Sequence, residues 1–427
     1  MKPLGEADGA NLNKSLNKTM EYPKLNPIEA FPVEHEGQRV ICLRDPNRVS
    51  DKVMLISPET VFIISLFDGI NSREEIQAKC EERFGERVPP EEMEQLINQL
   101  DDALFLDSKK FKEYNNKIVE DFHSSIIRPS SQAGLSYPED IVELDSWFQK
   151  FFNEAQDSDT YVKPNGTLIG LISPHIDFTR GGHLYAKAYR ELNESCEADT
   201  YIIFGTSHYA EVDNPFILTR KSFETPLGIS DTNNELIDSL VRDCNWDLFD
   251  GEISHRTEHS IEFQVAFLQY VLREKKNYKI VPILCNSFHS LVQEGKSPVE
   301  DKRISTFLES LSKIISELGN KVFIIAGVDM AHVGPKFGDK EPVNDLILSR
   351  IKERDMNSLQ YSEKLDAEGF YRSIEEEKDW RKVCGLSSIY ATLSTIEAKK
   401  GKLLDYDQAL EPDTGSVVSF ASMGFYS

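Results

Sequence analysis

Histidine and aspartate residues directly follow three strand-like apolar runs of this chain. The runs lead into Ser173-Pro-His175, Thr206-Ser-His208 and Asp329-Met-Ala-His332. Because the carboxyl ends of buried strands in α/β folds point their first loop residues into one crevice, these side chains are expected to converge. Imidazole and carboxylate groups in one crevice can bind a metal ion or transfer protons. The spacing therefore predicts a metal or acid/base site at the ends of these strands.

Each of these motifs also has a purely structural interpretation. Pro174 would end a strand and direct His175 into a loop, where the ring could simply be hydrogen-bonded. Asp329 could cap a neighbouring element, and His332 could lie on the surface. Two histidines at equivalent strand ends, His175 and His208, favour the functional interpretation because paired imidazoles are common metal ligands.

Glu258-His-Ser-Ile-Glu262 and Cys384 are further candidates, each at the start of a predicted helix. The two glutamates can be explained by the favourable interaction of carboxylates with the helix dipole. His259 would act as an acid/base group if the start of its helix faces the crevice. Thiolates such as that of Cys384 are favoured at helix starts, although a cysteine taken alone is more often buried and inert.

Strand-like runs alternate with amphipathic helical stretches from about residue 127 to residue 427. This alternation predicts a three-layer α/β domain with a mainly parallel or mixed sheet. The predicted strands include residues 167–173, 200–206, 278–284, 322–328 and 416–421, and the predicted helices include 185–192, 235–242, 260–272, 304–318, 344–354 and 386–398.

Residues 23–107 predict a separate α+β unit. Two short strands, three helices and a terminal β element are typical of a winged-helix module. The stretches 61–69, 72–76 and 96–100 resemble the PqqD-like family of small winged-helix domains, which implies binding of peptides and partner proteins. A helical linker or an oligomerisation domain is the alternative. A DNA-binding winged helix is disfavoured because the third predicted helix is acidic.

The remaining segments are predicted to connect or precede these units. Residues 1–22, rich in Asn, Lys and Gly, are expected to be flexible. Residues 108–126 are expected to be a charged linker.

Composition excludes several classes of partner. The formal net charge of −24 and the pI near 4.9 disfavour nucleic acid and anionic membranes, because both would repel this chain. No stretch approaches the ~18 consecutive apolar residues of a membrane span. The six cysteines are scattered without a CxxC pair, which indicates reduced thiols and a cytoplasmic location.

The motifs occur in a consistent order along the second unit: Arg128-Pro, Ala133-Gly, Tyr137-Pro, Pro174-His175, Gly205-Thr-Ser-His208, Thr225-Pro-Leu-Gly228, Glu258-His-Ser-Ile-Glu262, Val281-Pro-Ile283, Asp329-Met-Ala-His332 and Cys384-Gly385. This ordered set resembles the MEMO family, also called AmmeMemoRadiSam system protein B. The resemblance implies the fold of class III extradiol dioxygenases, whose non-haem iron lies in an α/β crevice. It implies His175, His208 and Cys384 as metal ligands.

The resemblance also implies roles around the ligands. Asp329 and His332 would line the pocket, and His259 would be the acid/base neighbour. Where the family usually has Pro-His-Ala-Gly-Tyr, this chain has Pro-His-Ile-Asp-Phe, so Asp177 adds a carboxylate that could orient His175 or donate an oxygen. Glu262 is a second candidate partner behind the ligands.

The donor set and the resemblance together suggest an oxidoreductase. Two imidazoles and a thiolate suit Fe(II), Cu or Zn better than Mg or Ca, and iron is expected first. The expected function is a metal-dependent redox or dioxygenase-like enzyme in a pathway with radical-SAM and AMMECR-type partners. One alternative is a scaffold protein with a vestigial metal pocket, recruited through the PqqD-like domain. The other is a zinc-dependent hydrolase, since zinc is redox-silent and can only activate water.

Overall fold

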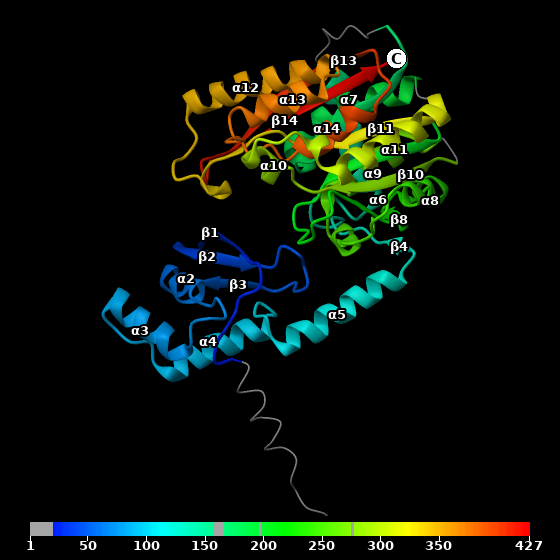
Figure 1. Cartoon of the computed structure of the whole chain (residues 1–427). Helices are drawn as coiled ribbons and strands as arrows, with labels where there is room; N and C mark the ends of the chain where they lie inside the picture. The colour runs from blue at the N-terminus through cyan, green and yellow to red at the C-terminus, as the bar shows by residue number, and fades with distance from the viewer. Residues whose placement is uncertain (1–19, 157–164, 196–197, 275–276) are drawn as a thin grey trace, which may run out of the picture. The chain divides into compact units, whose positions relative to one another are not determined.

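The computed structural model describes residues 20–156, 165–195, 198–274 and 277–427, and the chain forms two compact units, Met1–Ser124 and Ser125–Ser427 (Figure 1). Most of the predicted flexible segment, residues 1–22, therefore lies outside the described residues. The predicted linker is largely a helix, α5 (Lys109–Ser124).

The first unit combines an antiparallel sheet with helices. Ser72 caps the helix α3 (Arg73–Phe84) and Glu75 returns the hydrogen bond, which is a capping box, and Gly85 ends the same helix in a left-handed conformation. Apolar side chains at helical spacing, including Ile76 and Ile97, form the buried core. The sheet order is β1-β2-β3, with β1 (Glu29–His35), β2 (Gln38–Arg44) and β3 (Val53–Ile56), and the helices are α2 (Pro58–Ser65), α3 (Arg73–Phe84), α4 (Pro90–Asp102) and α5.

The second unit is built on an eight-stranded mixed sheet. Its strands, in sheet order, are β12 (His332–Val333), β14 (Ser416–Tyr426), β5 (Leu168–Ser173), β11 (Val322–Gly327), β6 (Thr200–Thr206), β10 (Lys279–Cys285) and β7 (Phe216–Leu218), and β13 (Lys400–Glu411) is paired to β14. β5, β11, β6 and β10 run parallel, whereas β14 and β7 are antiparallel to their neighbours. The parallel strands are almost entirely buried, as their continuous apolar sequences require.

Helices pack on both faces of this sheet. Consecutive side chains of β5 point to opposite faces of the sheet, and accordingly Leu171 and Ile172 belong to two different hydrophobic clusters. The cluster containing Leu171 includes α6, α7 and α9, and the cluster containing Ile172 includes α8, α11, α13 and α14. The helices are α6 (Ile141–Gln156), α7 (Phe178–Ser195), α8 (Asn234–Asp243), α9 (His259–Val271), α10 (His289–Glu294), α11 (Lys302–Leu318), α12 (Asp345–Glu363), α13 (Ala367–Glu375) and α14 (Leu386–Thr395), and four short 3-10 turns are Glu252–Arg256, Pro298–Glu300, Gly319–Lys321 and Pro335–Phe337.

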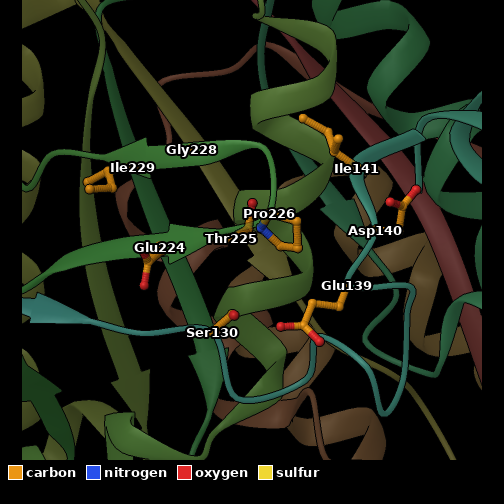
Figure 2. Close-up of a pocket in the computed structure, with 9 residues that line it drawn as sticks. All are labelled: Ser130, Glu139, Asp140, Ile141, Glu224, Thr225, Pro226, Gly228 and Ile229. Carbon is orange, nitrogen blue, oxygen red and sulfur yellow. The ribbon is translucent and has the colours of Figure 1, made fainter. Parts of the chain in front are cut away.

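A small second sheet, β4-β8-β9, lies in the same unit beside an open pocket (Figure 2). Its strands are β4 (Ile127–Arg128), β8 (Ser222–Thr225) and β9 (Gly228–Ser230). Glu139, Asp140 and Glu224 are acidic residues that line this pocket, and none of the predicted metal ligands is among its lining residues. Within the described residues, no helix has both the length and the apolar character needed to cross a bilayer.

Candidate metal centre

The three predicted strand-end motifs meet at one edge of the large sheet. β5, β11 and β6 are parallel neighbours, and they end at Ser173, Gly327 and Thr206. His175, Asp329 and His208 each follow two residues after the end of their strand. Neighbouring parallel strands deliver the residues that follow them to the same side, so the geometry brings these groups together.

Two helices deliver the other predicted residues to the same place. His259 is the first residue of α9, and Cys384 lies two residues before α14. The ring centroids of His175 and His208 are 4.9 Å apart, those of His175 and His259 are 5.2 Å apart, and those of His208 and His259 are 4.9 Å apart. The side chain of His175 is 3% exposed, whereas His208 is 23% and His259 is 30% exposed. His175 therefore forms the floor of the site, and the other two rings face its opening.

The potential ligand atoms fall into two groups that share His175. Among the described residues, the donor atoms lie within 4.8 Å of one another in the set His175, His208, His259 and in the set His175, His332, Cys384. The three ligands that the family resemblance implies, His175, His208 and Cys384, are thus divided between an all-imidazole group and a thiol-containing group.

Hydrogen bonds fix how the rings present their nitrogen atoms. The Nδ1 atom of His175 lies 3.1 Å from the carbonyl oxygen of Gly327, and that of His332 lies 3.2 Å from the carbonyl oxygen of Met330. A carbonyl oxygen can only accept, so both Nδ1 atoms carry the proton. Each Nε2 atom is then left with a lone pair, which is the form of imidazole that binds metals.

Glu258 fixes His208 in the same way, and the sequence reasoning missed this role. One carboxylate oxygen of Glu258 lies 2.9 Å from His208 Nδ1 and accepts the main-chain N–H of His208 at 3.2 Å. The other oxygen accepts the N–H groups of His259 and Ser260 and lies 3.2 Å from His259 Nδ1. A carboxylate behind a ligating histidine is a common feature of metal sites. Its only sequence signal, a glutamate at a helix start, fits a helix-dipole role equally well.

Charges around Glu258 keep it ionised. Burial alone would raise the pKa of this carboxyl, but His208, His259 and the hydrogen bonds lower the pKa well below its ordinary value. Burial and the neighbouring imidazoles lower the pKa of His175 well below the ordinary value, and burial lowers that of His332 to about 4. His175 and His332 are therefore neutral and able to donate a lone pair near pH 7.

Replacing Glu258 with glutamine should weaken metal binding by about 10–100-fold, the typical cost of losing a carboxylate that orients a ligand. The amide keeps an acceptor for the helix start but lacks the charge that favours the Nδ1–H form of His208. Competition titration with a chelator measures the affinity. Glu235→Gln, in the first turn of α8, is the matched control and should leave it unchanged. Equal affinities for Glu258→Gln and wild type would refute the orienting role.

Asp329 and Cys384 complete the buried side of the site. Asp329 accepts the main-chain N–H groups of His175 at 2.9 Å and Ile176 at 3.2 Å, and burial raises the pKa of its carboxyl to about 7. Cys384 Sγ lies 3.3 Å from His175 Nε2 and 3.4 Å from the carbonyl oxygen of Asp329. Burial and the nearby Asp329 raise the pKa of the Cys384 thiol well above its ordinary value. Without a metal the thiol is therefore protonated.

The structure gives Asp177 and Glu262 partners other than the candidate ligands. Asp177 accepts hydrogen bonds from Thr179 and Arg180 at the start of α7. Its carboxylate is thus engaged in capping, while the Gly327 carbonyl orients the ring of His175. Glu262 is fully buried and binds Arg128, Ser131, Gln132 and Tyr137.

Glu262 nevertheless supports the site from a distance. Arg128, which it holds, donates from Nη2 to the main-chain oxygen of Glu258 at 2.8 Å and from Nε to that of His255 at 2.8 Å. The buried pair therefore connects the segment before α9 to β4, near the start of the second unit.

The donor set fits a borderline or soft transition-metal ion. Oriented neutral imidazoles and a thiol are the ligands of iron, copper and zinc, whereas magnesium and calcium prefer oxygen atoms. A bound cation would displace the thiol proton, because the thiolate is the ligating form. Partly exposed His208 and His259 leave an approach for a further molecule.

Comparison with known proteins gives one family. The family model described as "Memo-like protein" matches residues 128–424. A MEMO1 family protein of Aquifex aeolicus is 29% identical over 406 residues, which cover 93% of this chain and 99% of that protein. A MEMO1 family protein of Methanopyrus kandleri is 27% identical over 70% of this chain and 98% of its own length. Another, of Methanosarcina barkeri, is 30% identical over 60% of this chain and 86% of its own length. The Aquifex alignment is long enough that it must extend into the first unit.

Proposed function

The chain belongs to the Memo-like family, and on that premise we propose that it is a metal-dependent redox protein whose centre lies at the ends of β5, β6 and β11. The observation that carries the proposal is the convergence of oriented imidazoles and one thiol on His175. We propose His175, His208 and Cys384 as the ligands, with His259 and His332 as the neighbouring imidazoles that face the bound substrate.

Fe(II) is the proposed ion, with Cu or Zn as alternatives. Iron or copper bound here would supply one-electron chemistry and a binding position for dioxygen, whereas zinc would supply only Lewis acidity. The dioxygenase-like reading is supported by the position of the site at the carboxyl ends of parallel strands. In this proposal the side chains of His259 and His332 hold or move protons of the substrate, and Asp329 fixes the main chain of His175.

The metal content of protein purified without oxygen tests this proposal. Wild-type protein should retain about one iron or copper ion per chain, and His208→Ala and Cys384→Ser should each retain far less, because each loses a donor. His183→Ala is a matched control, since that side chain is also partly exposed and pairs with Asp407 rather than with the site. Wild-type protein without bound metal, or a metal content indifferent to both changes, would refute the proposal. Stoichiometric zinc would favour the hydrolase, whose activity should survive substitution by cobalt.

A scaffold function is the second candidate, and one observation in the first unit favours it. β3 lies at the edge of the sheet β1-β2-β3, and its side chains Val53 and Leu55 are 60% and 44% exposed. An open edge with apolar side chains suits docking of an extended segment. Under this proposal the PqqD-like unit recruits radical-SAM and AMMECR-type proteins. Val53→Asp with Leu55→Asp should then weaken binding of those purified proteins, and unchanged binding would argue against recruitment through this edge.

We also propose a cytoplasmic location. The five cysteines in the described residues are unpaired, which suits a reducing compartment: Cys42, Cys80, Cys244, Cys285 and Cys384.

A further inference from the structure

A carboxylate outside every predicted motif lies behind the thiol-containing half of the site. Asp355, on α12, is completely buried. Its Oδ1 atom accepts a hydrogen bond from Arg381 Nη1, and its Oδ2 atom accepts from Ser419 Oγ at 2.5 Å and from Tyr406 OH at 2.8 Å. Three segments of the chain therefore meet on this one side chain.

The first of these segments carries Cys384. Arg381 is completely buried three residues before Cys384, and it also donates to Ser358 and Glu377. Its main-chain oxygen accepts the N–H of His332 at 2.7 Å. Anchoring the guanidinium on Asp355 therefore fixes the main chain that leads to Cys384 and, at the same time, the main chain of His332.

The second segment reaches the loop between Asp329 and His332. The Oγ atom of Ser419 accepts the main-chain N–H of Ala331 at 2.9 Å while it donates to Asp355. The main chain of Ser419 also exchanges hydrogen bonds with Met330 and Ala331. Asp355 is thus connected through one hydroxyl group to the centre of the loop that presents Asp329 and His332.

The third segment does not reach the site. Tyr406 lies on β13, which contains no candidate ligand and, within the described residues, pairs with β14 on the side away from β5 and β12. Its hydroxyl shares Oδ2 of Asp355 with Ser419. Tyr406 therefore provides an internal comparison: it binds the same carboxylate without holding a ligand-bearing loop.

We propose that Asp355 is a positioning residue for the metal centre, setting the positions of Cys384 and of His332 through Arg381 and Ser419. This inference rests on the function proposed above. A buried Arg–Asp pair can also serve stability alone, and breaking one strongly lowers stability in either case. What distinguishes positioning is an effect on the metal and the thiol beyond that expected from the loss of stability.

Cobalt(II) is the probe, because a thiolate ligand gives cobalt an intense charge-transfer absorption that imidazole ligands do not give. The full chain is compared with Asp355→Asn, Ser419→Ala and Tyr406→Phe, using the absorption band, the cobalt affinity and the free energy of unfolding. Asp355→Asn should weaken cobalt binding by about 10–100-fold and shift or weaken the band. Ser419→Ala should change both in the same direction but less, because only one of the two connections is lost.

Tyr406→Phe should lower stability only slightly, because one hydrogen bond is lost, while the band and the affinity stay within about twofold of wild type. An Asp355→Asn protein with an unchanged band and affinity would overturn the inference. So would a Tyr406→Phe protein that changes them as much as Ser419→Ala does. If Asp355→Asn does not fold, the contrast between Ser419→Ala and Tyr406→Phe decides the question.

The alkylation rate of Cys384 in metal-free protein separates this inference from the proposed function. Peptide mass spectrometry reports this rate whether or not the protein binds a metal. Asp355→Asn and Ser419→Ala should change it several-fold, and Tyr406→Phe should not. Wild-type protein that binds no cobalt would refute the metal-dependent function, while the alkylation rates would still show whether Asp355 positions the thiol. Equal rates in all four proteins would refute the positioning role.

Discussion

Replacing His175 with alanine should nearly abolish metal binding, because His175 belongs to both donor groups. A closed four-ligand zinc site binds with about 10–16 kcal/mol, or ~2.5–4 kcal/mol per ligand. At 1.4 kcal/mol for each tenfold change, losing one ligand lowers affinity by about 100- to 1000-fold. Chelator competition with the purified variant measures this loss. Retention of affinity within tenfold of wild type would exclude His175 as a ligand.

His259 and His332, which each belong to only one of the two donor groups found among the described residues, can show which group holds the ion. His259 belongs only to the all-imidazole group, and His332 only to the group with Cys384. If the ion occupies the thiol-containing group, His332→Ala should approach the effect of His175→Ala while His259→Ala has little effect. The reverse order would place the ion among the three imidazoles. Equal effects of His332→Ala and His259→Ala would indicate that the ion is bound by ligands from both groups.

Replacing Arg128 with alanine should lower the free energy of unfolding by about 3–5 kcal/mol, the typical cost of leaving one partner of a buried ion pair alone. Arg128 and Glu262 are both completely buried, and the guanidinium also donates to the main-chain oxygens of His255, Pro129 and Glu258. Denaturant unfolding measures the loss. Arg220→Ala is the control: its side chain is 42% exposed and pairs with Asp238, so it should cost less than about 1 kcal/mol.

The free energy of unfolding lost in Arg128→Ala should also depend on pH. Burial raises the pKa of Glu262, but Arg128, Tyr137 and Ser131 more than offset it and lower the pKa below its ordinary value of 4.5. In wild type, the stability contributed by Glu262 is therefore present above pH 4.5 and is lost as the pH falls below it. Without Arg128, burial dominates and the pKa of Glu262 rises. The difference between the two proteins should hence be largest near neutral pH and shrink on acidification.

Local sequence patterns were sufficient to predict the family and the parallel strands that lead to the site. The predicted MEMO family is confirmed, and the parallel strands β5, β6 and β11 lie where their apolar runs predict them. An uninterrupted apolar run followed by a polar residue specifies both a buried strand and the direction of the residue after it. For this reason His175, His208 and Asp329 were recognisable before any contact was known. The winged-helix nature of residues 23–107 stays a prediction.

Two elements of the second unit were not predicted from the sequence, and they differ in the signal they carry. The buried residues of α6, Leu144, Phe148, Phe151 and Ala155, recur at helical spacing, so this signal was local, whereas that of β13 is not. The helix α6 (Ile141–Gln156) and the strand β13 (Lys400–Glu411) were not predicted, and α12 extends to Glu363, well beyond the predicted end at residue 354. None of the residues of β13 is fully buried, and its pairing with β14 places it in the sheet. Such an edge strand is defined by its neighbour more than by its own sequence.

The roles of the supporting carboxylates were decided by tertiary structure alone. Glu258 and Glu262 are one helical turn apart and look alike in sequence, yet Glu258 orients His208 and Glu262 binds Arg128, 134 residues away. Asp355 belongs to no motif and acquires its partners from segments up to 64 residues distant. Strand-end positions follow from local periodicity, whereas the partner of a buried carboxylate depends on which distant segments pack against it. Local periodicity therefore indicates which side chains follow the strands toward the site, whereas the packing of distant segments selects the carboxylates that hold them in place.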